Sequence, residues 1–491
     1  MVDNKDNYLI GDIRWKSVYP RHGFVLVIIC IFSLAGYPQD NHYWSQQFGA
    51  RATLMGGAMI GGVRDNSAIF YNPGAVPFIK YAGLSVNANI YKMDRIFIED
   101  GAGEGVNLNS AKTSFFPQII SGMFTWKKLH RIRFSYCLMT RNYENLFIKS
   151  RFTSRDFKIP TPGVDEYIGV FDYTNQLNEQ WLGFAASYKL TDKLGIGLSL
   201  FANYRSQSYQ QTNFTRKIML EDSTNWIHTE NNDRFVKYQV LTTLFKVGLA
   251  YETGRWNIGV TLTTPSFRIF GQGDLQREYA TYEISDNPED SANSFMMLDR
   301  VKKVKTYFHH PVVIGFGVEY AAEKTRIAVS GEYYFGIKQY RMISPQGDPF
   351  IYPPQYEDST SVQEAAAKFL VVEKAAKPIF NVGIGLEQQL FKKISLLAGF
   401  RTDFSNYRRT DQEGIFTNNG GAWNLYHCSA GISYHRKKQI ITIGLTYTFS
   451  TSVKVNPFAD INPNYSDNPQ ATVSAQSFAL SIGYTYFFPR E

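Results

Sequence analysis

The chain has 491 residues, of which 15% are aromatic and only 19% are charged, below the roughly 25% of an average soluble domain. Its longest strongly apolar run, residues 24–35, is too short for a bundle of membrane-spanning helices, which need roughly 20 apolar residues each. The many aromatic residues argue against disorder. The net charge of +8 comes from basic residues scattered along the chain, a pattern that does not indicate nucleic-acid binding.

Residues 1–36 have the features of a signal peptide. Arg14, Lys16 and Arg21 precede the apolar run, and Ser33-Leu34-Ala35 provides small residues for cleavage near Ala35 or Gly36. A signal anchor that stays attached and a lipid-modified Cys30 are the alternatives. Export from the cytoplasm is therefore expected.

Beyond residue 80, large apolar side chains alternate with small or polar ones. In residues 441–449, the odd positions carry Ile, Leu, Tyr or Phe and the even positions carry Thr or Gly. A period of two places these sets on opposite faces of a strand. An apolar face opposite a face of small and polar residues is typical of a transmembrane β-barrel, since a soluble sandwich carries charge on its exposed face.

Fourteen such runs predict an all-β fold, a 14-stranded antiparallel transmembrane β-barrel formed by residues 81–491. The predicted strands are residues 81–91, 116–126, 130–141, 180–190, 193–205, 240–252, 255–265, 311–321, 325–337, 379–390, 393–405, 425–435, 438–450 and 475–488. Six short turns alternate with seven long connections, the pattern of outer-membrane barrels with periplasmic turns and long extracellular loops. We therefore expect a monomer in the bacterial outer membrane, surrounded by its lipids.

Two regions fall outside this pattern. Residues 37–80 contain no long alternating run and are few enough to fold into the barrel lumen. Residues 361–377 predict a helix, because Ser361-Val-Gln-Glu364 is a capping box and Pro378 would end it. Its apolar side should pack over the mouth of the barrel or lie at the lipid surface.

The segment before the first strand also carries a motif. Within residues 47–75, a Gly- and Ala-rich stretch leads through Asp65-Asn66-Ser67-Ala68 to Tyr71-Asn72-Pro73-Gly74-Ala75. This stretch resembles the N-terminal hatch of the FadL/TodX family of outer-membrane transporters, with Gly74 in place of the usual Ala. The resemblance implies a barrel plugged by residues 37–80, in which Asn72, Pro73, Gly74 and Ala75 form the hatch motif.

Glycines facing the lumen are expected to leave room for such a plug. They are Gly195, Gly197, Gly248, Gly259, Gly315, Gly317, Gly383 and Gly385. Taken alone, Asn-Pro-Gly would indicate only a turn.

The resemblance implies a transport channel that takes up hydrophobic small molecules, such as long-chain fatty acids or aromatic hydrocarbons. External loops such as 206–239 and 266–310 would capture the ligand, and a gap beside a kinked third strand would release it sideways. The predicted third strand, 130–141, contains no Gly or Pro and so does not support a kink. The alternative is a FadL-like scaffold or shuttle barrel of type IX protein secretion in Bacteroidetes, with secretion-system proteins as partners.

No motif indicates catalysis, so we expect no enzyme activity, no cofactor and no metal site, and the sequence identifies no ligand-binding residues. His309-His310 is interpreted as interfacial rather than metal-binding. Cys137 and Cys428 should lie on opposite faces of the wall and remain free. Inward-facing charged residues are expected to pair with one another or with the plug: Lys189, Lys246, Glu319, Glu332, Glu387, Arg401 and Asp403.

Overall fold

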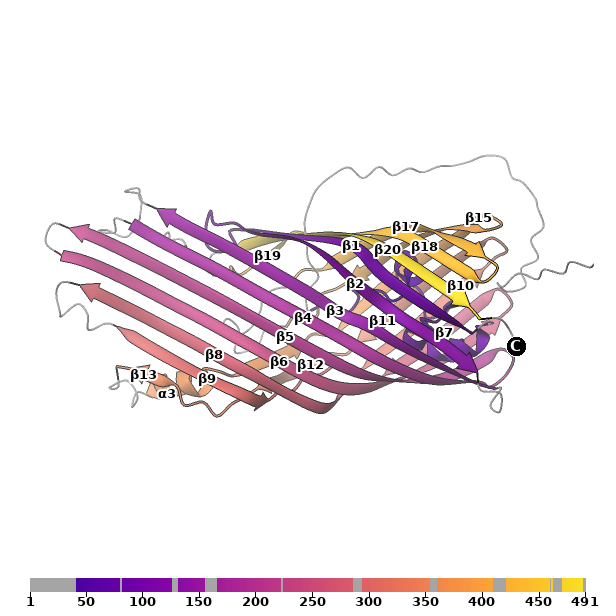
Figure 1. Cartoon of the computed structure of the whole chain (residues 1–491), viewed down its shortest axis with the longest axis horizontal. Coiled ribbons are helices and arrows are strands. Elements are labelled where there is room, and N and C mark those ends of the chain that lie inside the picture. Colours follow the sequence, from indigo (N-terminus) through magenta and orange to yellow (C-terminus); the bar gives the residue numbers. More distant parts are fainter. Residues whose placement is uncertain are drawn as a thin grey trace, which may run out of the picture.

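The computed structural model describes residues 41–79, 82–125, 131–154, 166–221, 224–285, 294–353, 360–408, 421–459, 461 and 470–488. The predicted signal peptide, residues 1–36, lies outside these ranges. The described residues form an elongated barrel, with strands on one side that project far beyond those on the other (Figure 1).

The wall of the barrel contains 14 antiparallel strands, so the predicted fold class is confirmed. Its segments are β1 (Gly83–Glu99), β2 (Leu108–Thr125), β3 (Ile132–Ser154), β4 (Glu166–Lys189), β5 (Leu194–Glu221), β6 (Thr224–Thr253), β7 (Trp256–Thr263), β8 (Phe267–Ser285), β9 (Phe295–Lys305), β10 (Val313–Ala321), β11 (Thr325–Tyr334), β15 (Ile379–Phe391), β16 (Ile394–Asp403), β17 (Leu425–Arg436), β18 (Gln439–Ser450) and β20 (Ala471–Phe487). Because β7 and β8 both pair with β6, they form one interrupted wall strand, and β9 and β10 form the next. Pairing of β20 with β1 closes the barrel.

Short elements complete the described chain. They are β12 (Ile337–Ile343), β13 (Phe350–Tyr352), β14 (Val372–Ala376), β19 (Val453–Val455), the helices α1 (Ala50–Leu54), α2 (Ala68–Tyr71) and α3 (Thr360–Lys368), and the 3-10 helix η1 (Pro73–Phe78). None of the helices in the described ranges is long and apolar enough to cross a membrane.

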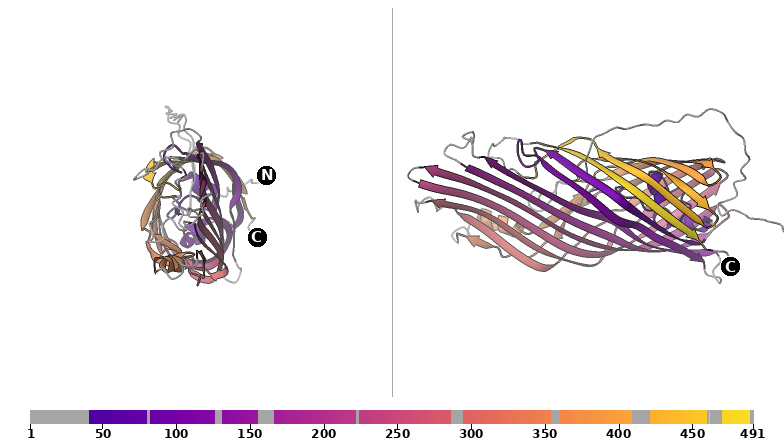
Figure 2. Two further views of the ribbon diagram at one scale, coloured as in Figure 1. Left: turned by 90° about the vertical axis from the view of Figure 1, so that its left-hand side faces the viewer. Right: turned by 45° about the horizontal axis from the view of Figure 1, so that its top comes forward.

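Four of the seven predicted long loops are wrong over most of their length. Residues 92–115, 142–179, 206–239 and 266–310 are largely strand, and β5 and β6 reach 28 and 30 residues. These extensions carry apolar side chains mainly on the inner face, such as Ile148, Phe171 and Val236, and largely polar side chains on the outer face. They therefore lack the lipid-facing apolar set that revealed the membrane-level strands. Continuous pairing with the neighbouring strand keeps them extended. Between β5 and β6, this pairing runs without a break from Leu194↔Tyr251 to Glu221↔Thr224. Figure 2 shows these extensions on one side of the molecule.

A band of large apolar side chains surrounds the outer surface near the tight-turn end. On β18, Ile441, Ile443 and Leu445 are more than 40% exposed, whereas Thr442 and Thr446 at alternate positions are buried. The same alternation recurs on the other wall strands, and it places the apolar set outside and the small set inside. A continuous apolar exterior of this kind belongs in lipid, which places the barrel in the outer membrane.

The cysteines follow the same geometry. Cys137 on β3 is buried on the lumenal face and Cys428 on β17 is exposed on the outer face, and neither forms a disulfide. The prediction of two unbridged thiols is confirmed.

The predicted helix at 361–377 is wrong in its second half. Helix α3 ends at Lys368, and residues 372–376 form β14, which pairs with β12. Phe369, Leu370 and Val372 are buried in an apolar cluster with side chains of β6, β8 and β12. Burial of these side chains and the strand pairing outweigh the helical preference of this stretch.

Candidate functional site

Residues 41–79, here called the lumenal segment, lie inside the barrel. Helix α1 lies next to β16, β17, β18 and β20, and η1 lies next to β4, β5 and β6. The largest fully buried side chains of the molecule include many from this segment: Phe48, Leu54, Met55, Met59, Ile60 and Ile69. The segment is therefore packed against most of the inner wall.

Glycines of the wall allow this packing. At each of the eight lumen-facing glycines named from the sequence, an added Cβ would lie within 2.9 Å of an atom of the lumenal segment. At Gly259 on β7, the nearest atoms are the carbonyl oxygen of Ile60 and the side-chain nitrogen of Asn72. Real Cβ atoms do not approach other heavy atoms this closely, so each position requires glycine for the observed packing.

Asn72 connects the lumenal segment to the wall. Its side chain is fully buried, and its Nδ2 donates to the carbonyl oxygens of Ile60 and of Leu249 on β6, both at 2.9 Å. Its Oδ1 accepts a hydrogen bond from Gly74 N at 3.0 Å and caps η1. Pro73 and Gly74 lie against wall glycines of β5 and β6, and Ala75 is buried. The four motif residues thus lie together at this contact.

Replacing Asn72 with alanine is expected to loosen the lumenal segment without unfolding the barrel. The change removes three hydrogen bonds and leaves buried backbone groups unpaired, at a cost of about 1–3 kcal/mol each. Limited proteolysis of purified protein should therefore cut the segment faster, while the abundance of the barrel in the membrane stays close to normal. Asn257→Ala serves as a control, because that buried asparagine bonds to Glu319 of the wall. Equal protease resistance of Asn72→Ala and the wild type would contradict this role.

Ion pairs also hold the lumenal segment. Arg51 Nη2 lies 2.8 Å from Glu387 and 3.5 Å from Glu319, and Arg64 Nη1 lies 2.9 Å from Glu252. Burial lowers the pKa of Arg51, but the carboxylates of Glu387 and Glu319 raise it above its usual value overall. The guanidinium is therefore charged at any physiological pH.

Most of the predicted lumenal charges contact the segment or each other. Trp44 donates its indole N–H to Glu332 at 2.7 Å and its backbone N–H to Asp403 at 2.9 Å, and Arg401 donates to the Trp44 carbonyl. Lys246 lies 3.6 Å from Glu332. Lys189 at the end of β4 pairs with Asp192, and its ammonium lies 6.0 Å from the ring centroid of Phe78 in the segment.

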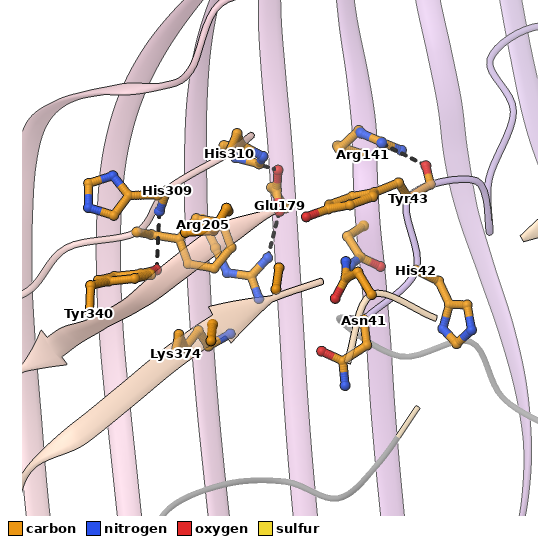
Figure 3. A pocket seen from close by; sticks show the side chains of 16 residues that line it. Asn41, His42, Tyr43, Arg141, Glu179, Arg205, His309, His310, Tyr340 and Lys374 are labelled. Carbon is orange, nitrogen blue, oxygen red and sulfur yellow. Dashed lines mark hydrogen bonds and ion pairs between the residues drawn. The ribbon is translucent and has the colours of Figure 1, made fainter. Parts of the chain in front are cut away.

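A cavity of about 60 Å³, here called the outer cavity, lies on the side of the lumenal segment that faces the strand extensions. Arg205 of β5 and His310 approach the carboxylate of Glu179 on β4, at 2.6 and 3.4 Å (Figure 3). Phe308 lies between two cations, 4.1 Å from the Arg205 guanidinium and 5.0 Å from the Lys374 ammonium. The cavity combines aromatic surface with several cationic groups.

The outer cavity exists because one wall strand is interrupted. Between β9 and β10, residues 306–312 leave the wall, and His310 is bonded through its backbone to Ser266 in the break between β7 and β8. Phe308, His309 and His310 therefore line the cavity. The interfacial interpretation of the two histidines is wrong.

A larger cavity of about 180 Å³, here called the inner cavity, lies between the lumenal segment and β1, β18 and β20. Its lining mixes charged, hydroxyl and apolar side chains: Arg51, Ser67, Phe78, Ile440, Thr442 and Phe487. On this side of the barrel, the lumenal segment is less tightly packed than it is against the wall glycines.

The wall also has a seam, here defined as residues 108–118 of β2 beside residues 140–154 of β3. Backbone pairing between these strands runs only from Thr125↔Arg133 to Ile119↔Met139. Further out, β2 pairs with β1, and β3 pairs with β4. Side chains bridge the seam: Ser110 Oγ donates to the Phe147 carbonyl at 2.6 Å, and the rings of Phe116 and Tyr143 stack with centroids 5.2 Å apart.

The seam is present although β3 contains no Gly or Pro. A bulge interrupts the β3 register between Thr140 and Asn142. Pro117 lies on the adjoining strand β2, where it has no N–H to offer β3. The residues of the third strand alone therefore gave no indication of the seam.

Solved structures of similar fold identify the architecture. The toluene transporter TodX of Pseudomonas putida superposes with a TM-score of 0.57 at 15% identity, over 90% of this chain and 99% of that one. A FadL homologue of Pseudomonas aeruginosa gives a TM-score of 0.53 at 13% identity, over 91% and 100% of the two chains. The toluene transporter TbuX of Ralstonia pickettii gives 0.50 at 15%, over 90% and 98%. The chain has the FadL/TodX barrel fold. No family model and no curated protein sequence matches it.

No pattern in the sequence predicted the residues that line the outer cavity. One signal was available: Pro265 and Pro311 occupy the two breaks of adjacent wall strands, and proline cannot donate a ladder hydrogen bond. In the described part of the chain, no three His, Cys, Asp or Glu side chains lie close enough to hold a metal ion.

Proposed function

We propose that the chain is an outer-membrane channel that takes up hydrophobic small molecules, with long-chain fatty acids and aromatic hydrocarbons as the substrate classes. One observation carries the proposal: a wall seam closed only by side chains lies beside a barrel interior filled by the lumenal segment. A water-filled pore would need neither feature. The similarity to two toluene transporters supports the same substrate chemistry.

The outer cavity is the proposed site of first binding inside the barrel. Tyr43, Phe308 and Tyr340 provide aromatic surface, and Arg205 and Lys374 provide positive charge. A ligand with an apolar body and an acidic end would use both features, because its body would contact the rings and its acidic group would lie near the cations. This chemistry favours amphipathic carboxylic acids over neutral hydrocarbons.

In this proposal the lumenal segment acts as the hatch, and the seam is the exit. The segment blocks the direct path along the barrel axis, since its side chains are buried against the inner wall. The seam needs only side-chain movements to open, because no backbone hydrogen bond spans it. An apolar ligand released there enters the membrane rather than water, which the hydrophobic effect favours.

Substitution of Arg205 tests the proposed site. Expressed in a host that lacks its own transporter, the wild type should increase uptake of radiolabelled oleate and toluene. Arg205→Ala should lower oleate uptake by about tenfold, because it removes a charge-assisted interaction worth roughly 1.5–3 kcal/mol and leaves the carboxylate of Glu179 in the cavity without its guanidinium partner, while toluene uptake changes less. The control is Arg255→Ala, an exposed arginine beside the turn after β6. Equal oleate uptake by Arg205→Ala and the control would contradict the assignment.

Deletion of this gene from its own host addresses the secretion alternative. If the deletion host secretes its protein cargo normally but loses oleate uptake, the result supports the channel. Lost secretion with unchanged uptake of both ligands would instead identify a scaffold.

A further inference from the structure

A group of exposed cations lies on the outer surface of two wall strands, β6 and β9, which flank β8. We call it the basic face, and it consists of Lys237, Arg300, Lys302, Lys303 and Lys305. Strand register places Lys305 opposite Gln272 and Arg300 opposite Gln276 of β8. Along the other edge of β8, which pairs with β6, Asp274 lies opposite Lys237 of β6. The basic residues are scattered along the sequence, but strand pairing brings these five together.

The basic face has few acidic neighbours. Within the described residues, none of its five side chains takes part in an ion pair. Three carboxylates lie near it: Asp274 and Glu278 of β8, and Asp233 of β6, which lies opposite Glu278. Each accepts a hydrogen bond from another group, namely Lys303 N, Asn231 Nδ2 and Thr212 Oγ1 respectively. Five cations against three engaged carboxylates leave a positively charged surface.

The basic face lies directly next to the apolar band. Phe267, Ile269 and Phe270 at the start of β8 are 46–57% exposed on the outer surface. The polar positions begin directly after them, at Gln272 and Asp274. The ring of Tyr307 lies 5.2 Å from the Lys305 ammonium, and tyrosine is common where a membrane meets water. The basic face thus begins where the lipid-facing band ends on the extracellular side.

We propose that the basic face binds the phosphate groups of anionic lipids in the outer leaflet. The proposal rests on the outer-membrane location of the barrel but not on which ligand it transports. Each basic side chain next to a membrane strengthens binding of an anionic headgroup about fivefold. Acyl chains of the same lipid would contact Phe267, Ile269 and Phe270, so one molecule satisfies both surfaces. Because Lys305 adjoins residues 306–312, the bound lipid would lie against the wall beside the outer cavity.

Native mass spectrometry of the detergent-purified full chain, with added lipid A or phosphatidylcholine, tests the proposal. The variant is K302Q/K303Q/K305Q, and the matched control is K392Q/K393Q/K438Q, which removes three exposed lysines from turns at the other end of the barrel. The first variant should bind lipid A on the order of 100-fold more weakly than the wild type. The control should bind lipid A like the wild type, and binding of phosphatidylcholine should be the same in all three proteins.

Two results would overturn the proposal. One is equal lipid A binding by the two triple variants. The other is full displacement of lipid A by millimolar inorganic phosphate, which would assign the face to small anions. Uptake of oleate by the wild type separates this inference from the proposed function. If lipid A binding depends on the three lysines but the wild type takes up no oleate, the proposed channel function is contradicted and the proposed lipid site stands.

Discussion

Deleting residues 41–79 is expected to convert a closed barrel into an open pore. The lumenal segment contributes many of the largest buried side chains, so its removal leaves the space inside the wall empty. The wall itself should persist, because its strands satisfy their backbone hydrogen bonds by closure. Glu319, Glu332, Glu387 and Arg401 would lose partners in the segment and face water. Water and ions would then fill the lumen.

Planar-bilayer conductance measures this effect. The full-length protein should show little current, and the deletion protein should show large, stable conductance steps. A deletion protein that folds, as judged by its circular dichroism, but conducts no more than the full length would show that the segment is not the plug.

Replacing Gly259 with alanine is expected to displace the lumenal segment from an otherwise normal barrel. The new methyl group would overlap the backbone oxygen of Ile60 and the side chain of Asn72. Neither the wall strand nor the segment can move aside easily, since both groups are fixed by hydrogen bonds. Overpacking of this kind costs about 1–3 kcal/mol, and the cost falls on docking of the segment.

Gly331→Ala provides the matched control. Its methyl group would meet the outer end of the Phe380 ring on the lipid-facing side, where a side chain can turn away. Gly259→Ala should therefore show raised conductance and faster proteolysis of residues 41–79, and Gly331→Ala should show neither. Equal behaviour of the two variants would contradict the role given to the wall glycines.

Sequence reasoning succeeded where one face of a strand is apolar. Residues 441–449 could be placed correctly because lipid on one side and a packed lumen on the other impose alternation. The extensions of β5 and β6 have a largely polar outer face, and their buried apolar side chains, such as Val236 and Tyr238, are few and interspersed with polar ones. Their composition therefore does not distinguish strand from loop. Their structure depends on pairing that propagates from the membrane level.

The candidate site was only partly accessible from the sequence for a related reason. Glu179 and Arg205 face each other because the tight turn after β4 sets the register of β4 and β5, so this pair could have been deduced. His310 reaches the same carboxylate only because residues 306–312 leave the wall. That displacement involves hydrogen bonds between His310 and Ser266, which lies far from Glu179 in the sequence.

Uptake with the seam locked tests the central claim most directly. Phe116 and Tyr143, which stack across the seam, are changed to cysteine in a C137S/C428S background and joined by a cleavable thiol cross-linker. The control joins Tyr426 and Phe449 in the same way, since these rings stack 5.6 Å apart on strands that are already hydrogen-bonded to each other. If the seam is the exit, locking it should reduce oleate uptake to the level of the empty host, and cleavage of the linker should restore it, while the control protein transports normally throughout. Unchanged uptake with a fully locked seam would contradict the account.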